Sequence, residues 1–183
     1  MATTALVSEI LIIGLEAEAW LTVLVLAVFG SSWADVGALK GWEALVTILV
    51  LATAYVLGIL VDRLADSSLR PWTRGKDRPG FALERLVVLH RSVGIGPFLE
   101  YQRSRVRIAR GTLFNVIPAG VSVAALIASS STVDRRWLLA VPVVTLALFA
   151  LTLFATRRIN KAYEKRLVQS YRIVTTSGTP PNA

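Results

Sequence analysis

Four long apolar stretches constrain this chain more than any other feature of its sequence. An α-helix needs roughly 20 mostly apolar residues to cross the ~30 Å hydrocarbon layer of a bilayer, and each stretch is close to that length. Hydrophobic residues make up 54% of the 183-residue chain and charged residues only 17%. We therefore expect four membrane-spanning segments, at Ile10–Phe29, Ala44–Val61, Thr112–Ser129 and Trp137–Ala155.

These stretches predict helices rather than barrel strands. They are continuously apolar, whereas a membrane strand alternates apolar and polar residues over about ten positions. The predicted fold class is all-α, an integral membrane protein with four transmembrane helices. A cleaved signal peptide is the alternative interpretation of the first stretch, but the residues before it include Glu9 and no Lys or Arg, which is untypical of a signal peptide.

Lysine and arginine are distributed unevenly among the connecting segments. Eleven lie between Asp62 and Gly111 and six follow Ala155, whereas the two other connections hold three in total. Basic residues near helix ends are retained on the cytoplasmic side of a membrane. We therefore predict a multi-pass protein of the cell (inner) membrane, with both termini in the cytoplasm. Tryptophans at the predicted outer helix ends support this topology, because indole rings favour the membrane interface: Trp33, Trp42 and Trp137.

The predicted organisation has four parts. Residues 1–61 form the first transmembrane hairpin, 62–111 a basic cytoplasmic loop with amphipathic helices, 112–155 the second hairpin, and 156–183 a basic helix with a disordered tail. Within the loop, Asp66–Gly80 is rich in Pro, Gly, Ser and charge and predicts an irregular linker. Phe81–Val93 predicts a helix that lies along the membrane surface or against a partner. Pro97 suits the first turn of a helix that continues into the third span. Arg157–Arg172 extends the fourth span, before a disordered end from Thr175 onward.

Acidic residues in the first span are the first candidates for function, because an ionisable group inside a membrane helix is costly to insert. Glu16 and Glu18 lie within the span and Glu9 just before it, while Trp20 extends the face shared by Glu9 and Glu16. One hypothesis is that these four residues line an aqueous pore at the axis of an oligomer, where carboxylates attract cations. Two alternatives stay open: ion pairs with the arginines before the third span, and a first turn that lies in the headgroup region.

The arginines before the third span are the second group of candidates. Arg103, Arg107 and Arg110 are spaced four and three residues apart and share one face of the predicted helix, with Arg105 to the side. A guanidinium group can bind phosphate through two hydrogen bonds, so a nucleotide or oligonucleotide is one predicted ligand. The alternative is attraction to anionic membrane lipids, at ~1 kcal/mol per basic residue near the surface.

The third span carries two candidates for helix packing. The amide of Asn115 needs a hydrogen-bond partner, and Gly120 lies among small residues that let helices approach closely. The chain has no cysteine, a single histidine, no nucleophile motif and no phosphate-binding loop. We therefore predict no catalytic residue, no metal site and no cofactor, and we do not expect an enzyme.

Two pieces of the chain carry a resemblance to a known class of protein. They are the acidic first span, with Glu9, Glu16, Glu18 and Trp20, and the run Ser104–Arg110 before the third span. In size and layout the chain resembles the small bacterial four-helix membrane effectors of nucleotide-signalled anti-phage defence, some of which form oligomeric channels. The resemblance implies a homo-oligomeric channel whose opening is controlled by an anionic cytoplasmic ligand.

Two functions are therefore predicted from the sequence. The first is a homo-oligomeric channel or membrane-disrupting effector, gated by an anionic nucleotide or oligonucleotide at its arginine-rich cytoplasmic surface. The second is a non-conducting membrane anchor whose cytoplasmic helices dock a soluble partner protein. Both place the chain among membrane lipids.

Overall fold

The computed structural model is built of helices, and it describes residues 2–30, 40–73, 81–91, 96–131 and 133–176. Within these ranges there is no strand, and the predicted all-α fold class is confirmed. Four of the helices are long and apolar enough to cross a membrane, so the protein is membrane-embedded. The helices are α1 (Ala2–Phe29), α2 (Glu43–Thr73), α3 (Phe81–Arg91), α4 (Gly96–Ser129) and α5 (Trp137–Thr176).

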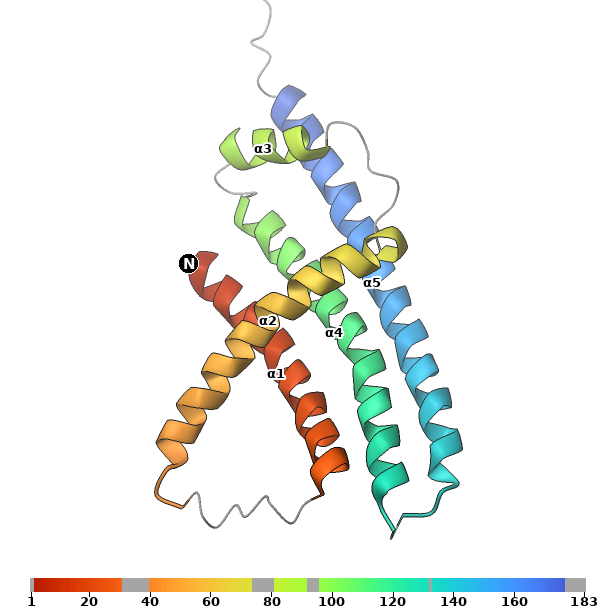
Figure 1. Cartoon of the computed structure of the whole chain (residues 1–183). Helices are drawn as coiled ribbons and strands as arrows, with labels where there is room; N and C mark the ends of the chain where they lie inside the picture. Colours follow the sequence, from red (N-terminus) through yellow and green to blue (C-terminus); the bar gives the residue numbers. More distant parts are fainter. Residues whose placement is uncertain (1, 31–39, 74–80, 92–95, 132, 177–183) are drawn as a thin grey trace, which may run out of the picture.

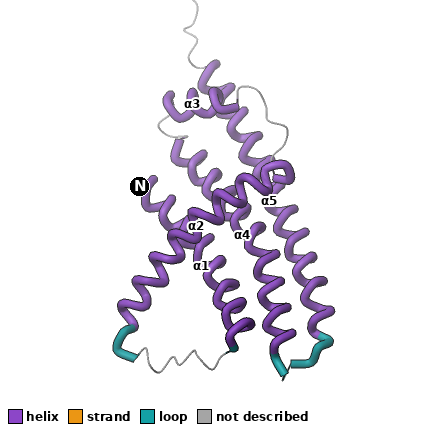
Figure 2. Tube along the Cα trace, in the orientation of Figure 1, coloured by secondary structure: helices purple, strands orange, loops and turns teal. Residues whose placement is uncertain are grey.

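Three helices run side by side, and the fourth spanning helix crosses them. Figure 1 shows α1, α4 and α5 aligned, with α2 passing diagonally over α1 and α4 toward α5. The closest helix pairs are α1 with α4, α1 with α2, and α4 with α5. The short helix α3 lies beside the last part of α5, as the tube in Figure 2 also shows. We call this end, which holds α3, the start of α4 and the last turns of α5, the basic end.

Helix α2 is longer than its sequence predicts. Asp66–Gly80 was expected to be an irregular linker, and this is wrong for the part up to Thr73, which is helical. Side chains of α5 stabilise the extension by binding the last carbonyl groups of α2, which have no partner within the helix. Arg157 Nε donates to the Trp72 carbonyl at 2.8 Å, and Asn160 Nδ2 to the Thr73 carbonyl at 3.1 Å. Residues 74–80 lie outside the described ranges.

The other helical predictions are close to the observed bounds. α3 covers the expected surface helix as far as Arg91, and Val93 lies outside the described residues. α4 begins at Gly96 and continues through the third span, with Pro97 in its first turn as predicted. α5 continues through Thr176, so the expected disorder from Thr175 is wrong for the first two residues, and 177–183 are not described.

Glycines set the crossing of α1 and α2. A Cβ atom on Gly14 would lie 1.6 Å from the Ala54 carbonyl oxygen, and one on Gly58 would lie 2.0 Å from the Ile10 carbonyl oxygen. The two backbones are therefore in direct contact, which a larger residue would prevent. Gly120 plays the predicted packing role between α4 and α5, because its Cβ would meet Thr145 Oγ1 at 2.3 Å. The Gly14 and Gly58 contact was not predicted, although Ala54 and Gly58 form a small-xxx-small pair that signals it.

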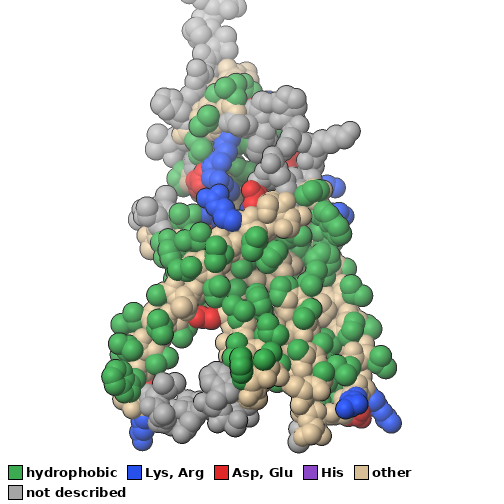
Figure 3. Space-filling view, in the orientation of Figure 1, with side chains coloured by type: hydrophobic (Ala, Val, Ile, Leu, Met, Phe, Trp, Pro, Cys, Tyr) green, Lys and Arg blue, Asp and Glu red, His purple; other side chains and the backbone are tan. Residues whose placement is uncertain are grey.

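Among the described residues, more large apolar side chains lie on the outside of the bundle than in its interior. Figure 3 shows hydrophobic side chains spread over the long helices, with Lys and Arg gathered toward their ends, and Leu139, for example, is 79% exposed. The buried positions between α1, α2 and α4 include small or polar residues such as Ala17, Ala54 and Asn115. Lipid replaces water around such a surface, so apolar residues outside and polar residues inside are the stable arrangement.

Trp42 and Trp137 stand at the opposite end from the basic end. Trp42 directly precedes α2, Trp137 is the first residue of α5, and both side chains are exposed. Trp33 lies outside the described residues. The grouping of two indole rings at one end suits a membrane interface. The cytoplasmic location of the basic end and of the two termini stays a prediction.

Candidate functional site: a buried polar row between α1, α2 and α4

Charged side chains from three helices meet near the basic end. Arg107 Nη1 donates to Glu9 Oε2 at 3.1 Å and its Nε lies 3.8 Å from Asp62 Oδ1. Arg110 Nη2 is 3.6 Å from the same Asp62 oxygen, and Arg110 Nη1 is 2.6 Å from Asp66 Oδ1. We call these five residues the ion cluster. It joins α1 through Glu9, α2 through the two aspartates and α4 through the two arginines.

The ion cluster is largely removed from the surrounding medium. The side chains of Glu9 and Arg110 are 8% and 9% exposed, and that of Arg107 is 17% exposed. Burying a charge without a partner is strongly unfavourable, so each of these groups depends on its counter-charge. Of the alternatives for Glu9, an ion pair with an arginine inside one subunit is therefore the one observed.

Glu16 lies further along α1, where it is bound by neutral groups of α4. Thr112 Oγ1 donates to Glu16 Oε1 at 2.8 Å and Asn115 Nδ2 to Glu16 Oε2 at 3.2 Å. Asn115 Nδ2 also approaches the Ile13 carbonyl at 3.1 Å, while Asn115 Oδ1 accepts from Trp20 Nε1 at 3.2 Å. Asn115 thus makes the helix contact predicted for it. Glu16 has no arginine or lysine partner among the described residues.

Glu18 lies where α1 and α2 begin to separate. Its Oε1 accepts a hydrogen bond from Thr53 Oγ1, next to Ala54 at the helix crossing. The other oxygen, Oε2, is buried and has no hydrogen-bond partner within the described part of the chain. Before Thr53, α2 is largely exposed, and Figure 3 shows an acidic side chain at the upper edge of the opening between these helices.

We call these groups the polar row. It consists of three separate groups along α1: the ion cluster, then Glu16 with Asn115 and Trp20 on the α4 side, then Glu18 with Thr53 on the α2 side. Buried apolar side chains lie between the helices beside them: Ile13, Ala17 and Val61. Pore lining by Glu9, Glu16, Glu18 and Trp20 at an oligomer axis stays a prediction. The observed contacts of all four are made inside one subunit.

The four predicted arginines fall into two groups. Arg107 and Arg110 bind carboxylates in the ion cluster, so an added anion there has to compete with Glu9, Asp62 and Asp66. Arg103 is half-buried, and its Nη1 lies 4.0 Å from Glu100 Oε2. Arg105 is exposed and has no ion pair with a described residue. Binding of an anionic ligand or lipid by these four residues stays a prediction.

The sequence analysis missed the partners that come from outside α1 and the arginine run. Asp62 and Asp66 were counted only as charges of the loop, although their spacing of four residues places them on one helical face. Thr53 and Thr112 carried no signal, because a threonine in an apolar helix usually bonds its own backbone. Among the described residues, no group of three or more His, Cys, Asp or Glu side chains is placed to hold a metal ion.

The fold and the polar row together define a polytopic α-helical membrane protein with ionisable groups buried between its spanning helices. Comparison with protein-family models, with curated proteins and with solved structures gives no match. Its function therefore has to be inferred from the residues of the chain itself.

Proposed function

We propose that the protein is a homo-oligomeric cation channel of the cell membrane, with its basic end in the cytoplasm. The conducting path follows the polar row between α1, α2 and α4, and an anionic cytoplasmic ligand, a nucleotide or oligonucleotide, controls its opening. The protein acts as a membrane effector in this proposal, because opening the path dissipates ion gradients.

The observation that carries the proposal is the pair of carboxylates Glu16 and Glu18. Both lie in the apolar part of α1, and neither has a basic partner among the described residues. A carboxylate at the centre of a membrane helix costs roughly 2.5–3.5 kcal/mol to insert and therefore marks a functional position. Acidic side chains along a path favour cations over anions.

The ion cluster supplies the proposed gate. Arg107 joins Glu9 of α1 to Asp62 of α2, and Arg110 joins Asp62 to Asp66. While these ion pairs hold α1, α2 and α4 together, the five side chains close this end of the row to a permeating cation. An anion that draws Arg107 away from Glu9 frees α1 from α4 and removes this barrier. A ligand can shift the equilibrium from the closed to the open state only by binding the open state more tightly.

Ion flux from liposomes that hold the purified full chain tests the proposal. We expect cation flux that rises when cyclic nucleotides or short oligonucleotides are present on the basic side. In Glu16→Gln combined with Glu18→Gln, cation flux should fall at least about tenfold, which corresponds to ~1.4 kcal/mol in the barrier. The matched control is Glu43→Gln, an exposed carboxylate at the start of α2 that should leave flux unchanged.

Two outcomes contradict the channel. One is absence of flux under every ligand condition from protein that is folded and inserted. The other is equal flux in the Glu16 and Glu18 double variant and in wild type, which would mean that the path avoids the polar row.

A second function, docking of a soluble partner, is favoured by one observation. Helix α3 exposes Leu83 and Leu86, at 63% and 65%, beyond the long apolar segments. Exposed apolar groups outside the membrane mark interaction surfaces. Leu83→Glu combined with Leu86→Glu should release a co-purifying partner and leave flux intact, whereas loss of flux in this variant would tie α3 to channel opening instead.

A further inference from the structure

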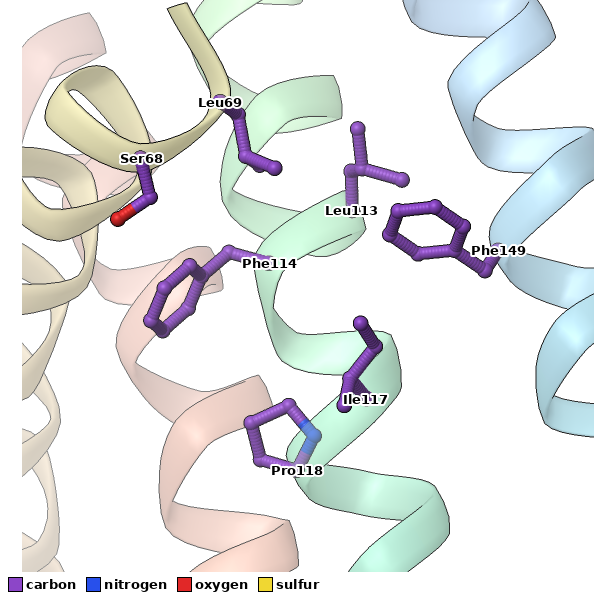
Figure 4. A pocket seen from close by; sticks show the side chains of 7 residues that line it. All are labelled: Ser68, Leu69, Leu113, Phe114, Ile117, Pro118 and Phe149. Carbon is purple, nitrogen blue, oxygen red and sulfur yellow. The ribbon is translucent and has the colours of Figure 1, made fainter. Parts of the chain in front are cut away.

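A cavity opens between α2, α4 and α5, and one of its lining side chains, Phe114, also packs against the buried apolar residues of α1 and α2. Its volume is about 320 Å³, within the range of small-molecule pockets of roughly 300–1,000 Å³. Figure 4 shows Phe149 of α5 facing α4, with the α2 residues on the other side. Apart from the Ser68 hydroxyl its side chains are apolar: Ser68, Leu69, Leu113, Phe114, Ile117, Pro118 and Phe149.

Trp72 connects this cavity to a basic side chain. Its ring meets the Phe149 ring edge to face, with the centroids 6.3 Å apart, and it lies three residues after Leu69 on α2. The carbonyl of Trp72 accepts the hydrogen bond from Arg157 Nε at 2.8 Å. The guanidinium group of Arg157 is therefore held beside the end of α2, on the basic side of the cavity.

Arg157 retains most of its binding capacity. A guanidinium group has five N–H donors, and only Nε is engaged with a described residue. The two terminal nitrogens, with four donors, have no hydrogen-bond partner in the described part of the chain, and the residue is exposed. Lys161, also exposed, lies four residues later on the same helical face. No acidic side chain within the described ranges pairs with either of them.

We propose that the cavity and Arg157 together bind one anionic phospholipid. The phosphate takes the terminal nitrogens of Arg157, with Lys161 adding charge, and an acyl chain enters the cavity beside Phe149 and Ile117. Trp72 stands between the two parts, at the level where indole rings favour the membrane interface. The site shares no residue with the polar row and does not depend on the proposed channel function.

The distance between the apolar cavity and Arg157 suits a phospholipid better than a free anion. Phe149 and Arg157 are eight residues apart on α5, which is ~12 Å along a helix axis at 1.5 Å per residue. Phe149 lies within the fourth apolar stretch, whereas Arg157 follows it directly. The apolar cavity lies at the depth of lipid acyl chains, and the anchored guanidinium lies at the depth of lipid headgroups. Together they are complementary to one molecule that has both an acyl chain and an anionic headgroup. A soluble phosphate compound uses only half of this site.

Native mass spectrometry of the full chain in detergent, titrated with phosphatidylglycerol or with phosphatidylcholine of the same acyl chains, tests the proposal. We expect one phosphatidylglycerol to be retained about tenfold more tightly than phosphatidylcholine. Arg157→Gln should remove that preference. Ile117→Phe, which fills the cavity and leaves Arg157 in place, should weaken both lipids. The matched control Arg158→Gln removes an equal charge from the next residue of α5 and should change retention less than about twofold.

Three results would overturn the proposal. Equal weakening by Arg158→Gln and Arg157→Gln would show diffuse attraction to a basic surface. Glycerol 3-phosphate that competes as well as the whole lipid would show an anion site without a chain site. Unchanged retention in Ile117→Phe would show that the cavity is not occupied. Because Arg157 also caps α2, the Ile117 variant keeps the test valid if Arg157→Gln unfolds.

Discussion

Helices α1 and α5 have similar apolar stretches but use them in opposite ways. α1 carries Glu9, Glu16 and Glu18 and turns them toward α4 and α2, where each finds a polar partner. The apolar part of α5 has no ionisable residue between Trp137 and Ala155 and exposes Leu139 and Leu146, at 79% and 68%. The difference shows that polar groups of the spans are placed between helices, whereas many apolar ones are left for lipid to surround.

The same contrast separates two sets of basic residues. Arg107 and Arg110 lie inside, where carboxylates neutralise them, whereas Arg157, Arg158 and Lys161 on α5 are exposed. The inner set holds helices together, and the outer set is available to anions. Substitutions on the α1 side should therefore change folding or conduction, whereas those of Arg158 and Lys161 should change only what binds from outside.

Gly14→Ala should have the largest effect, because the added methyl group collides with the Ala54 carbonyl and forces α1 and α2 apart. We expect a loss of ~3 kcal/mol in the free energy of unfolding, at the upper end for overpacking. Ala19→Leu adds more volume at an exposed position of α1 and should be tolerated. Thermal unfolding in detergent, followed by circular dichroism, measures both. Equal stability of the two variants would mean that the crossing is not tight.

Arg110→Gln should have the next largest effect, since it leaves Asp62 and Asp66 without their shared cation. Breaking a buried ion pair costs ~3–5 kcal/mol, and the 41% exposure of Asp66 reduces this to about 2 kcal/mol. Arg105→Gln, five residues earlier and exposed, is the matched control and should leave the unfolding transition unchanged. If Arg110→Gln and Arg105→Gln give the same free energy of unfolding, the buried arginine contributes no more to stability than the exposed one.

Thr112→Val and Thr152→Val form a matched pair that sharpens the comparison of α1 with α5. The Thr112 hydroxyl donates to Glu16 across two helices, whereas the Thr152 hydroxyl donates to the Leu148 carbonyl of its own helix. We expect Thr112→Val to lower the free energy of unfolding by about 1 kcal/mol, as for hydrogen bonds between membrane helices. Thr152→Val should have no measurable effect on the same unfolding curve. A larger loss from Thr152→Val would contradict the polar row as the stabilising contact.

Leu146→Ala should have the smallest effect, because lipid surrounds this side chain in the single subunit. A change within ~0.5 kcal/mol in the free energy of unfolding is expected. The subunit mass of the variant, measured by light scattering in detergent, adds a second readout. Dissociation of an oligomer by Leu146→Ala would show that this face of α5 meets a second copy rather than lipid.

Much of the fold was predictable from the sequence, and much less of the site. The four long apolar helices, the short helix from Phe81 and the start of α4 near Pro97 all follow from local hydropathy and helix-start signals. Glu9, Glu16 and Glu18 stood out because charge is rare in an apolar run. Their partners did not, since Thr112 is 96 residues from Glu16 and Thr53 is 35 residues from Glu18. Nothing local connects such pairs.

Four helices long and apolar enough to span a membrane, and the concentration of basic residues in one connection and the tail, can be read from the sequence alone. These properties are sums of single-residue transfer energies, which do not depend on neighbours in space. The continuation of α2 to Thr73, the pairing of Glu9 with Arg107 and the position of Arg157 beside an apolar cavity appear only in the folded structure. They depend on how closely the helices pack, which for α1 and α2 is set by Gly14 and Gly58.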